Sequence, residues 1–173
     1  MSSSPDSRIE ISPGDITKLE VDAIVNAANS RLQPGGGVCG AIHRAAGRNL
    51  REACAKTGRC KTGDAVHTDG FDLEAKYVIH TVGPVWRGGK QNEEALLASC
   101  YRTSLKIAKQ IGARSVAFPA ISTGIYAFPL ARATAIAVAT VRDFLAEDDS
   151  IDKVVFSVFG AEAEAAYRKE LGR

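Results

Sequence analysis

The sequence predicts an α/β protein, and three observations support that prediction. Short strand-like segments alternate with longer segments of helical periodicity along the 173 residues. Two special loops, 35–40 and 122–126, each follow an apolar run. Hydrophobic residues make up 45% of the chain and charged residues 24%, which is typical of a globular domain with a sizeable core. Alternating strands and helices predict a sheet that is covered by helices on both faces.

The first half of the chain is expected to contribute four strands and one segment of helical patterning. Residues 8–12 alternate and end at Pro13-Gly14, a turn signal, so they predict a short strand. The apolar run 21–28 predicts a buried strand that leads into the first glycine loop. Helical patterning follows over about 41–57. The two remaining strands of this half are expected at 64–68 and 76–82.

The second half is expected to add three helices and two strands. Apolar residues recur at helical spacing over 93–111, and a strand at 115–119 leads into the second loop. The remaining elements are a helix at 130–146, a strand at 153–159 and a helix at 161–171. In such sheets ligands bind at the carboxyl ends of strands. Because both loops lie at strand ends, we expect them to belong to one site.

Composition and charge argue against several classes of function. The formal charge of +2, with no run of five like charges, argues against a nucleic-acid partner. The four cysteines form no C-x-x-C pair, so we expect reduced thiols in or near the core, no metal site and no cofactor. No secretory segment and no apolar run of about 20 residues occurs, which predicts a cytoplasmic protein without a membrane partner. We expect a monomer with a disordered leader at 1–7 and a single domain at 8–173.

The first loop, Gly35 to Gly40, predicts a phosphate-binding site. Glycine lets backbone amides approach a ligand closely, and amides placed before a helix favour an anion. The loop also matches the dinucleotide pattern G-x-G-x-x-G, but six residues separate it from the strand. No acidic residue ends a second strand about 20 residues on, which disfavours a nicotinamide oxidoreductase. No Gly-Lys-Ser/Thr motif of a P-loop ATPase occurs, and a purely structural turn is the alternative.

The second loop, Ser122-Thr123-Gly124, follows Pro119-Ala120-Ile121. Alone it is a common turn. Together with the first loop it has a functional interpretation, because two amide-rich loops at neighbouring strand ends can hold a diphosphate from both sides.

Several polar residues near these loops have both a structural and a functional interpretation. Asn26 and Asn29 follow the apolar run, where an amide either binds a sugar hydroxyl or caps a loop. Asp15 begins a turn, where a carboxylate either accepts a bond from an exocyclic amino group or caps a helix. The three histidines lack metal-ligand spacing and are expected to be satisfied core or surface residues: His43, His67 and His80.

Five motifs occur in order along nearly the whole chain, from about residue 9 to 160. They are Gly14-Asp15-Ile16-Thr17, 21–30 (VDAIVNAANS), 35–47 (GGGVCGAIHRAAG), 78–86 (VIHTVGPVW) and 117–126 (AFPAISTGIY). Together they resemble the macro domain family, in its MacroD-type branch. The resemblance implies a three-layer α/β/α fold with a mixed six-stranded sheet and an ADP-ribose cleft.

The resemblance also implies a role for each motif. Asp15 would hold the adenine amino group beside the Ile16 backbone, and Phe159 would stack near adenine. Asn29 would bind the distal ribose, which Tyr126 would help to orient. The two loops would hold the diphosphate through backbone amides: Gly36, Gly37 and Val38 on one side, and Ser122, Thr123, Gly124, Ile125 and Tyr126 on the other.

MacroD-type members remove mono-ADP-ribose from acidic side chains of proteins and deacetylate O-acetyl-ADP-ribose. The resemblance therefore implies a hydrolase that acts on ADP-ribose and ADP-ribosylated proteins. The chain departs from this branch at Cys39, where an aspartate that activates or positions water is usual, and at Pro34, where a further glycine is usual.

A neutral thiol accepts protons and hydrogen bonds poorly, so Cys39 leaves three alternatives. In the first, a water held by the diphosphate and Asn29 hydrolyses the ester. In the second, the domain only binds ADP-ribose, as a reader. In the third, Cys39 is a nucleophile, although a nearby diphosphate would oppose thiolate formation and a space-filling thiol is the simpler interpretation. The otherwise intact pattern favours the first.

Overall fold

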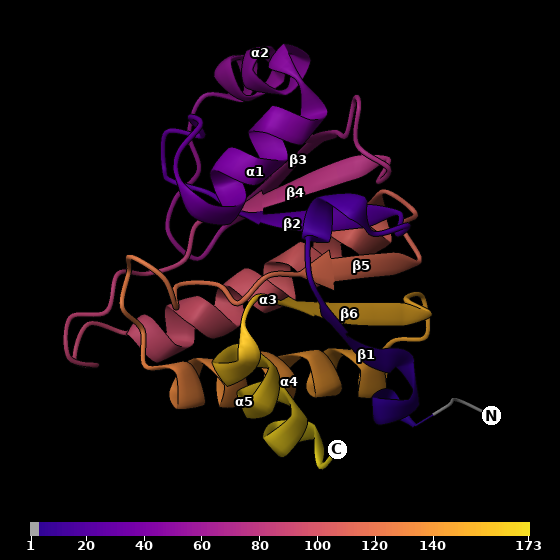
Figure 1. The fold of residues 1–173 in the computed structure, drawn as a ribbon, viewed down its shortest axis with the longest axis vertical. Coiled ribbons are helices and arrows are strands. Elements are labelled where there is room, and N and C mark those ends of the chain that lie inside the picture. Colours follow the sequence, from indigo (N-terminus) through magenta and orange to yellow (C-terminus); the bar gives the residue numbers. More distant parts are fainter. Residues whose placement is uncertain (1–3) are drawn as a thin grey trace.

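A six-stranded sheet in the order β1-β6-β5-β2-β4-β3 forms the centre of the protein (Figure 1). The computed structural model describes residues 4–173. The strands are β1 (Ile9–Pro13), β2 (Ala23–Ala27), β3 (Ala65–Asp69), β4 (Tyr77–Thr81), β5 (Ser115–Phe118) and β6 (Lys153–Val158). Five strands are parallel, and β3 pairs antiparallel with β4 at one edge. The mixed six-stranded sheet that the resemblance implied is confirmed.

Helices cover both faces of this sheet (Figure 1). They are α1 (Gly37–Ala46), α2 (Arg48–Thr57), α3 (Glu93–Gln110), α4 (Leu130–Glu147) and α5 (Ala161–Leu171), with 3-10 helices η1 (Pro5–Arg8) and η2 (Ile16–Lys18). α1, α2 and η2 pack on one face, and α3 and α4 pack on the other. α5 contacts α4 and β1. The α/β/α layering is therefore confirmed.

Alternation along the strands divides the core between the two faces. In β2, Val25 packs in the cluster that contains α3 and α4, whereas Ile24 packs in the cluster that contains α1 and α2. β6 repeats this pattern with Phe156 and Val155. Successive side chains of a strand point to opposite faces, so a sheet covered on both sides requires nearly continuous apolar strands.

The helical patterning expected over about 41–57 corresponds to two helices in the structure, α1 and α2. α1 already begins at Gly37, so Val38 and Cys39 belong to its first turn. Gly47 then separates α1 from α2 with a φ of 86°, a left-handed conformation that favours glycine. Apolar residues continue through both helices, and periodicity alone therefore does not show the break.

The segment expected to be a disordered leader, residues 1–7, is ordered from Pro5 onward. Pro5–Arg8 form η1, and the Asp6 carboxylate accepts two hydrogen bonds of 2.7 Å from the Arg142 guanidinium on α4. The bonds to Arg142 lower the pKa of Asp6. This ion pair attaches the segment to the domain. Residues 1–3 lie outside the described residues.

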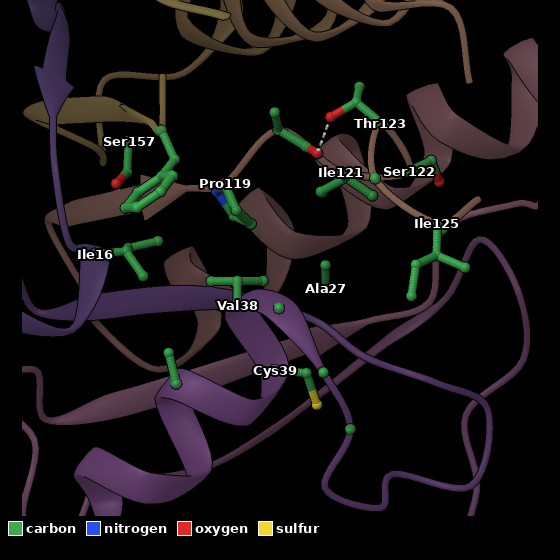
Figure 2. A pocket seen from close by; sticks show the side chains of 18 of the residues that line it. Ile16, Ala27, Val38, Cys39, Pro119, Ile121, Ser122, Thr123, Ile125 and Ser157 are labelled. Atoms are coloured by element: carbon green, nitrogen blue, oxygen red, sulfur yellow. Dashed lines mark hydrogen bonds between the residues drawn. The ribbon is translucent and has the colours of Figure 1, made fainter. Parts of the chain in front are cut away.

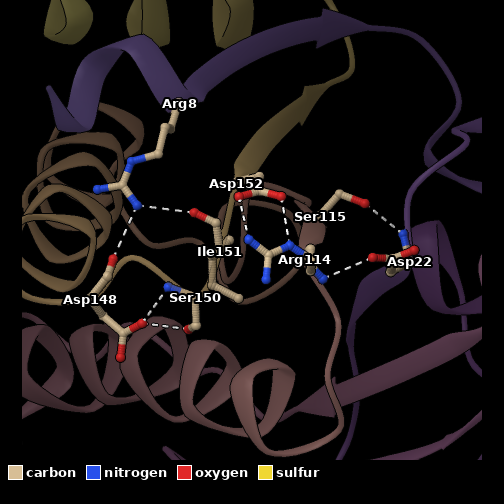
Figure 3. Close-up of polar contacts among 8 residues, drawn as sticks. All are labelled: Arg8, Asp22, Arg114, Ser115, Asp148, Ser150, Ile151 and Asp152. Carbon is tan, nitrogen blue, oxygen red and sulfur yellow. Dashed lines mark hydrogen bonds and ion pairs between the residues drawn. The ribbon is translucent and has the colours of Figure 1, made fainter. Parts of the chain in front are cut away.

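Polar bonds join the amino-terminal ends of the strands (Figure 3). The Arg8 guanidinium donates to the carbonyl oxygens of Asp148 and Ile151, each at 3.0 Å, just after α4. Arg114 pairs with Asp152 through two bonds of 2.7 and 2.8 Å between the starts of β5 and β6. These contacts fasten the sheet at the edge where the strands begin.

All four cysteines are free and buried, as expected for reduced core thiols. Over residues 4–173, no group of three or more His, Cys, Asp or Glu side chains is arranged to hold a metal ion. None of the helices in that range is both long and apolar enough to cross a membrane.

Candidate ligand-binding cleft

A cavity of about 750 Å³ lies at the opposite edge, where the parallel strands end. The residues to which the resemblance assigns a role all line it, together with Cys39: Asp15, Ile16, Asn29, Gly36, Gly37, Val38, Cys39, Ser122, Thr123, Gly124, Ile125, Tyr126 and Phe159. Asn26, the other amide considered for a sugar hydroxyl, is buried and does not line the cavity. Figure 2 shows Ile16 and Ser157 toward one end of this cleft and Ile125 toward the other. Its volume is in the usual range for a small-molecule site. The two loops thus share one cavity.

The first wall of the cleft is the amino-terminal turn of α1. Gly36, the N-cap, makes no side-chain cap bond, and the first amides of a helix have no partner within the helix. These amides and the helix dipole favour an anion. Gly40 packs so closely on the preceding loop that a Cβ there would lie 2.4 Å from the Gly35 carbonyl oxygen. Glycine at position 40 therefore allows the loop to fold back onto the helix.

The second wall, residues 119–126, has a strained backbone held by local bonds. Ser122 has a φ of 67°, which is uncommon for a residue other than glycine. The Phe128 N–H donates to the Ser122 carbonyl at 2.9 Å, and the Thr123 hydroxyl donates to the Ala120 carbonyl at 2.8 Å (Figure 2). The buried Ser122 Oγ has no hydrogen-bond partner in the described part of the chain.

Trp86 supports this second wall from the neighbouring loop. Its backbone N–H donates to the Tyr126 carbonyl at 2.8 Å. Its ring packs on Phe128 with the ring centroids 4.7 Å apart, and the Arg132 guanidinium lies 5.6 Å from the ring centroid. The wall is thereby joined to the segment that leads into α3.

Glu93 organises that segment at the start of α3. Its carboxylate accepts hydrogen bonds from three backbone N–H groups, those of Arg87, Gly89 and Gln91. Burial raises the pKa of Glu93, but these bonds outweigh it and lower the pKa to about 2. The carboxylate is therefore ionised at neutral pH and fixes the turn beside Trp86.

Asp15 and Phe159 lie at the end of the cleft formed by β1 and β6. These strands are neighbours, and the Gly14 N–H donates to the Val158 carbonyl at 3.0 Å. Asp15 caps η2, since its Oδ1 accepts from the Thr17 N–H at 2.9 Å and from the Thr17 hydroxyl at 2.7 Å. These bonds lower the pKa of Asp15. Phe159 is 87% exposed, so an apolar ring stands uncovered at this end.

Asn29 closes the turn that follows β2. Its Nδ2 donates to the Gln33 carbonyl at 2.8 Å, and its Oδ1 accepts from the N–H groups of Arg31 and Gln33 at 3.2 and 3.1 Å. Asn29 therefore caps this loop, which is the structural interpretation given for it above. An amide has two donor hydrogens and two acceptor lone pairs, so one Nδ2 hydrogen remains for a ligand while the oxygen is occupied.

Cys39 lies at the wall of the cleft, but its thiol contacts groups inside the protein. The residue is 5% exposed, and Sγ lies 3.6 Å from the Gln33 carbonyl oxygen and 3.7 Å from Asn26 Nδ2. Asn26 Nδ2 lies 3.0 Å from His80 Nδ1, and the ring Nε2 lies 3.0 Å from the Thr68 hydroxyl. Burial lowers the pKa of His80 to about 3. The thiol thus belongs to a buried polar network behind the first wall.

The structure also adds cleft residues to which the sequence analysis assigned no role. Arg44 on α1, Ser157 in β6 and Ala163 on α5 line the cleft. Arg44 lies seven positions after Gly37 and therefore on the same face of α1. This spacing could have indicated Arg44 only if the start of α1 had been known. Gly83 follows β4, and a Cβ there would lie 2.2 Å from the Ser122 hydroxyl oxygen.

The histidines lie outside the cleft lining, and the buried His43 Nδ1 has no hydrogen-bond partner among the described residues, so the expectation of a satisfied core histidine is wrong for His43. His43 and His80 are buried, and His67 is exposed on β3. Burial, with a smaller contribution from the Arg51 charge, lowers the pKa of His43. Both buried rings are therefore neutral at pH 7.

The fold and cleft together define a three-layer α/β/α protein with an elongated cleft at the carboxyl edge of a mixed sheet. The family model for the macro domain matches residues 25–137. A macro domain-containing protein of Chlorobaculum tepidum is 57% identical over 157 residues, which cover 91% of each chain. The chain belongs to the macro domain family.

Two further relatives carry more specific names. An O-acetyl-ADP-ribose deacetylase of Escherichia fergusonii is 53% identical over 169 residues, covering 95% of this chain and 96% of that protein. A Trypanosoma brucei macrodomain, solved in complex with ADP-ribose, superposes with a TM-score of 0.88 at 44% identity and covers 94% of this chain and 68% of that chain. This chain and the Trypanosoma brucei macrodomain thus share the macro domain fold over 94% of this chain.

Proposed function

We propose that this protein binds ADP-ribose and hydrolyses mono-ADP-ribose esters on modified proteins, as a member of the MacroD-type branch. The observation that supports this most is the pairing of two amide-rich walls, the first turn of α1 and residues 122–126, across one cavity. Such a pair suits a diphosphate. The names of the relatives from Escherichia fergusonii and Trypanosoma brucei support ADP-ribose as ligand and O-acetyl-ADP-ribose as a second substrate.

The two ends of the cleft suit the two ends of ADP-ribose. At the β1–β6 end, Asp15 offers a carboxylate oxygen for the adenine amino group beside Ile16, and Phe159 offers an uncovered ring for stacking. At the β2 end, Asn29 offers one N–H to a ribose hydroxyl, and Tyr126 lines the same cavity from the second wall. The diphosphate would lie between these ends.

The hydrolytic step would use a water that is positioned without a protein carboxylate. Among the lining residues that the structure describes, Asp15 is the sole carboxylate, and it lies at the adenine end. The Asn29 oxygen already accepts two bonds, so Asn29 can orient a water or hydroxyl only by donating. A diphosphate oxygen would accept the proton as water attacks the anomeric carbon and the bond to the carboxylate leaving group breaks.

A reader that binds ADP-ribose without turnover is the second candidate. The observation that favours it is Cys39, which stands where the branch usually has an aspartate and whose thiol contacts Gln33 and Asn26. This geometry also makes a nucleophilic role for Cys39 the weakest alternative, because the sulfur is buried and already in polar contact.

Two measurements test the proposal. ADP-ribose should raise the melting temperature clearly and AMP only weakly, since AMP lacks the second phosphate and ribose. The absence of any stabilisation by ADP-ribose would overturn the binding claim. A timed assay on a glutamate-linked mono-ADP-ribosylated protein then separates hydrolase from reader, because a reader binds the substrate and releases no ADP-ribose over time.

The proposal also includes a cytoplasmic monomer. Size-exclusion chromatography with light scattering tests the oligomeric state, and a mass of two copies would contradict it. Fractionation of the host cell tests the location.

A further inference from the structure

A second cavity, of about 760 Å³, lies beside the cleft and is lined by three arginines, Arg31, Arg51 and Arg59. We call it the arginine cavity. The three side chains are exposed, and within residues 4–173 none of them takes part in an ion pair. Guanidinium groups bind carboxylates and phosphates through paired hydrogen bonds. A hollow edged by three unpaired guanidinium groups therefore suits an anionic partner.

The turn after β2 separates the arginine cavity from the cleft. Asn29 and Gly35 line the cleft, whereas residues 31–34 between them line the arginine cavity. The Cys60 N–H donates to the Ser30 carbonyl at 3.0 Å, which holds the segment after α2 against this turn. Figure 1 shows the chain between β2 and α1 running beside α1 and α2. The arginine cavity thus adjoins the Asn29 end of the cleft.

Charge is concentrated in this part of the chain, although the net charge is only +2. Residues 30–61 contain seven of the 22 lysines and arginines but only one of the 20 acidic residues, Glu52. Glu52 lies 3.9 Å from the Arg48 guanidinium, so it is partly neutralised by another cation. The surface beside the Asn29 end therefore presents a positive potential.

We propose that the arginine cavity binds an acidic segment of the protein from which ADP-ribose is removed. The inference rests on the proposed function, because an ADP-ribosylated acidic side chain would leave the cleft at the Asn29 end. Carboxylates that flank the modified residue would then lie beside Arg31 and Arg59 and form charge-assisted hydrogen bonds. Nucleic acid is the competing occupant. An acidic peptide is favoured because the modified protein is attached to the distal ribose, which lies at the Asn29 end of the cleft, whereas adenine lies at the other end.

The first test uses an unmodified, fluorescently labelled glutamate-rich peptide and no ADP-ribose. Anisotropy should show binding that weakens with added salt, and the double variant Arg31→Gln/Arg59→Gln should weaken it about tenfold. The control Arg102→Gln/Lys106→Gln removes two exposed charges from α3, on the other face of the sheet, and should leave the affinity unchanged. Equal losses in both double variants, or no loss in the first, would overturn the inference. So would stronger binding of a DNA oligonucleotide of matched charge.

The second test separates this inference from the proposed function. Calorimetry should give the same ADP-ribose affinity for the wild type and for Arg31→Gln/Arg59→Gln, whose melting temperatures should also agree. For a mono-ADP-ribosylated peptide with acidic flanks, the double variant should raise KM and leave kcat unchanged, while a peptide with neutral flanks should show no change. If ADP-ribose fails to bind while the acidic peptide still binds, the proposed function is overturned, and binding of an acidic peptide to the arginine cavity is still supported. An unchanged KM for the acidic peptide contradicts the inference alone.

Discussion

The Asn29 side chain and the Gln33 backbone bond to each other in both directions. Asn29 Nδ2 donates to the Gln33 carbonyl at 2.8 Å, and the Gln33 N–H donates back to Asn29 Oδ1 at 3.1 Å. A single amide thus shapes the turn that divides the cleft from the arginine cavity. It keeps one hydrogen free for a ligand, so loss of this side chain should affect both the turn and the ligand.

Replacing Asn29 with alanine should therefore lower both stability and turnover. We expect a loss of about 1 kcal/mol in the free energy of unfolding and an about tenfold slower release of ADP-ribose, because turn-closing bonds and one ligand donor disappear together. Gln33→Ala is the matched control, since the bonds to Asn29 use only the backbone of Gln33. Urea unfolding and the timed assay measure the two effects. Wild-type turnover in Asn29→Ala would remove Asn29 from the mechanism.

Replacing Cys39 with serine should retain most of the activity. Serine is close to cysteine in volume and can donate to the Gln33 carbonyl in place of the thiol, so the stability change should stay below about 1.5 kcal/mol. The wild-type and variant proteins are compared by ADP-ribose calorimetry and by the timed assay. Complete loss of turnover with an unchanged ADP-ribose affinity would support the nucleophile alternative instead.

Glycines 36 and 40 should respond differently to alanine. At Gly40 a Cβ would lie 2.4 Å from the Gly35 carbonyl oxygen, so Gly40→Ala should cost about 1–3 kcal/mol and displace the first wall. At Gly36 no atom beyond the adjacent residues lies within 4 Å of the added Cβ, so Gly36→Ala should keep its melting temperature. Thermal unfolding with and without ADP-ribose checks both variants. Equal melting temperatures for the two variants would contradict the close packing at Gly40.

His80 should make the protein less stable as the pH falls below 6.5. Its pKa is lowered from 6.5 to about 3 by burial, so the unfolded chain takes up a proton that the native protein does not. Above pH 6.5 the neutral His80 does not reduce the free energy of unfolding. As the pH falls from 6.5 toward 3 the free energy of unfolding declines, by about 2 kcal/mol between pH 7 and pH 5. Urea unfolding across this range measures the slope. His80→Gln should make the free energy of unfolding less dependent on pH, whereas substitution of the exposed His67 should not. The same pH dependence in the wild type and in His80→Gln would refute the assignment of this effect to His80.

The strands and the shared cleft could be predicted from the sequence because their causes are local. A run such as Ile24-Val25 must be buried on both faces, and parallel strands bring their carboxyl ends to one edge. The apolar pattern did not locate the break at Gly47, because the pattern passes through it and the backbone conformation differs at this residue. The antiparallel direction of β3 depends on its pairing with β4, which no local pattern encodes.

Side-chain partnerships were the other part that the sequence could not supply. The contact of Cys39 with Asn26 joins α1 to β2, and the contact of Asn26 with His80 joins β2 to β4. Each pair depends on packing between elements that are distant in sequence. The same holds for the ion pair of Asp6 with Arg142, which joins η1 to α4. The arginine cavity likewise depends on how α2 packs beside the turn after β2.

The bonds of Glu93 to the 87–91 turn, and of Trp86 to Tyr126, have a thermodynamic consequence for ligand capture. The backbone around Tyr126 is already ordered when the protein folds, so the entropy of fixing it is lost then and not at each binding event. A ligand that contacts this wall would then lose mainly its own conformational freedom. Loss of the Glu93 carboxylate would transfer that ordering cost from folding to binding.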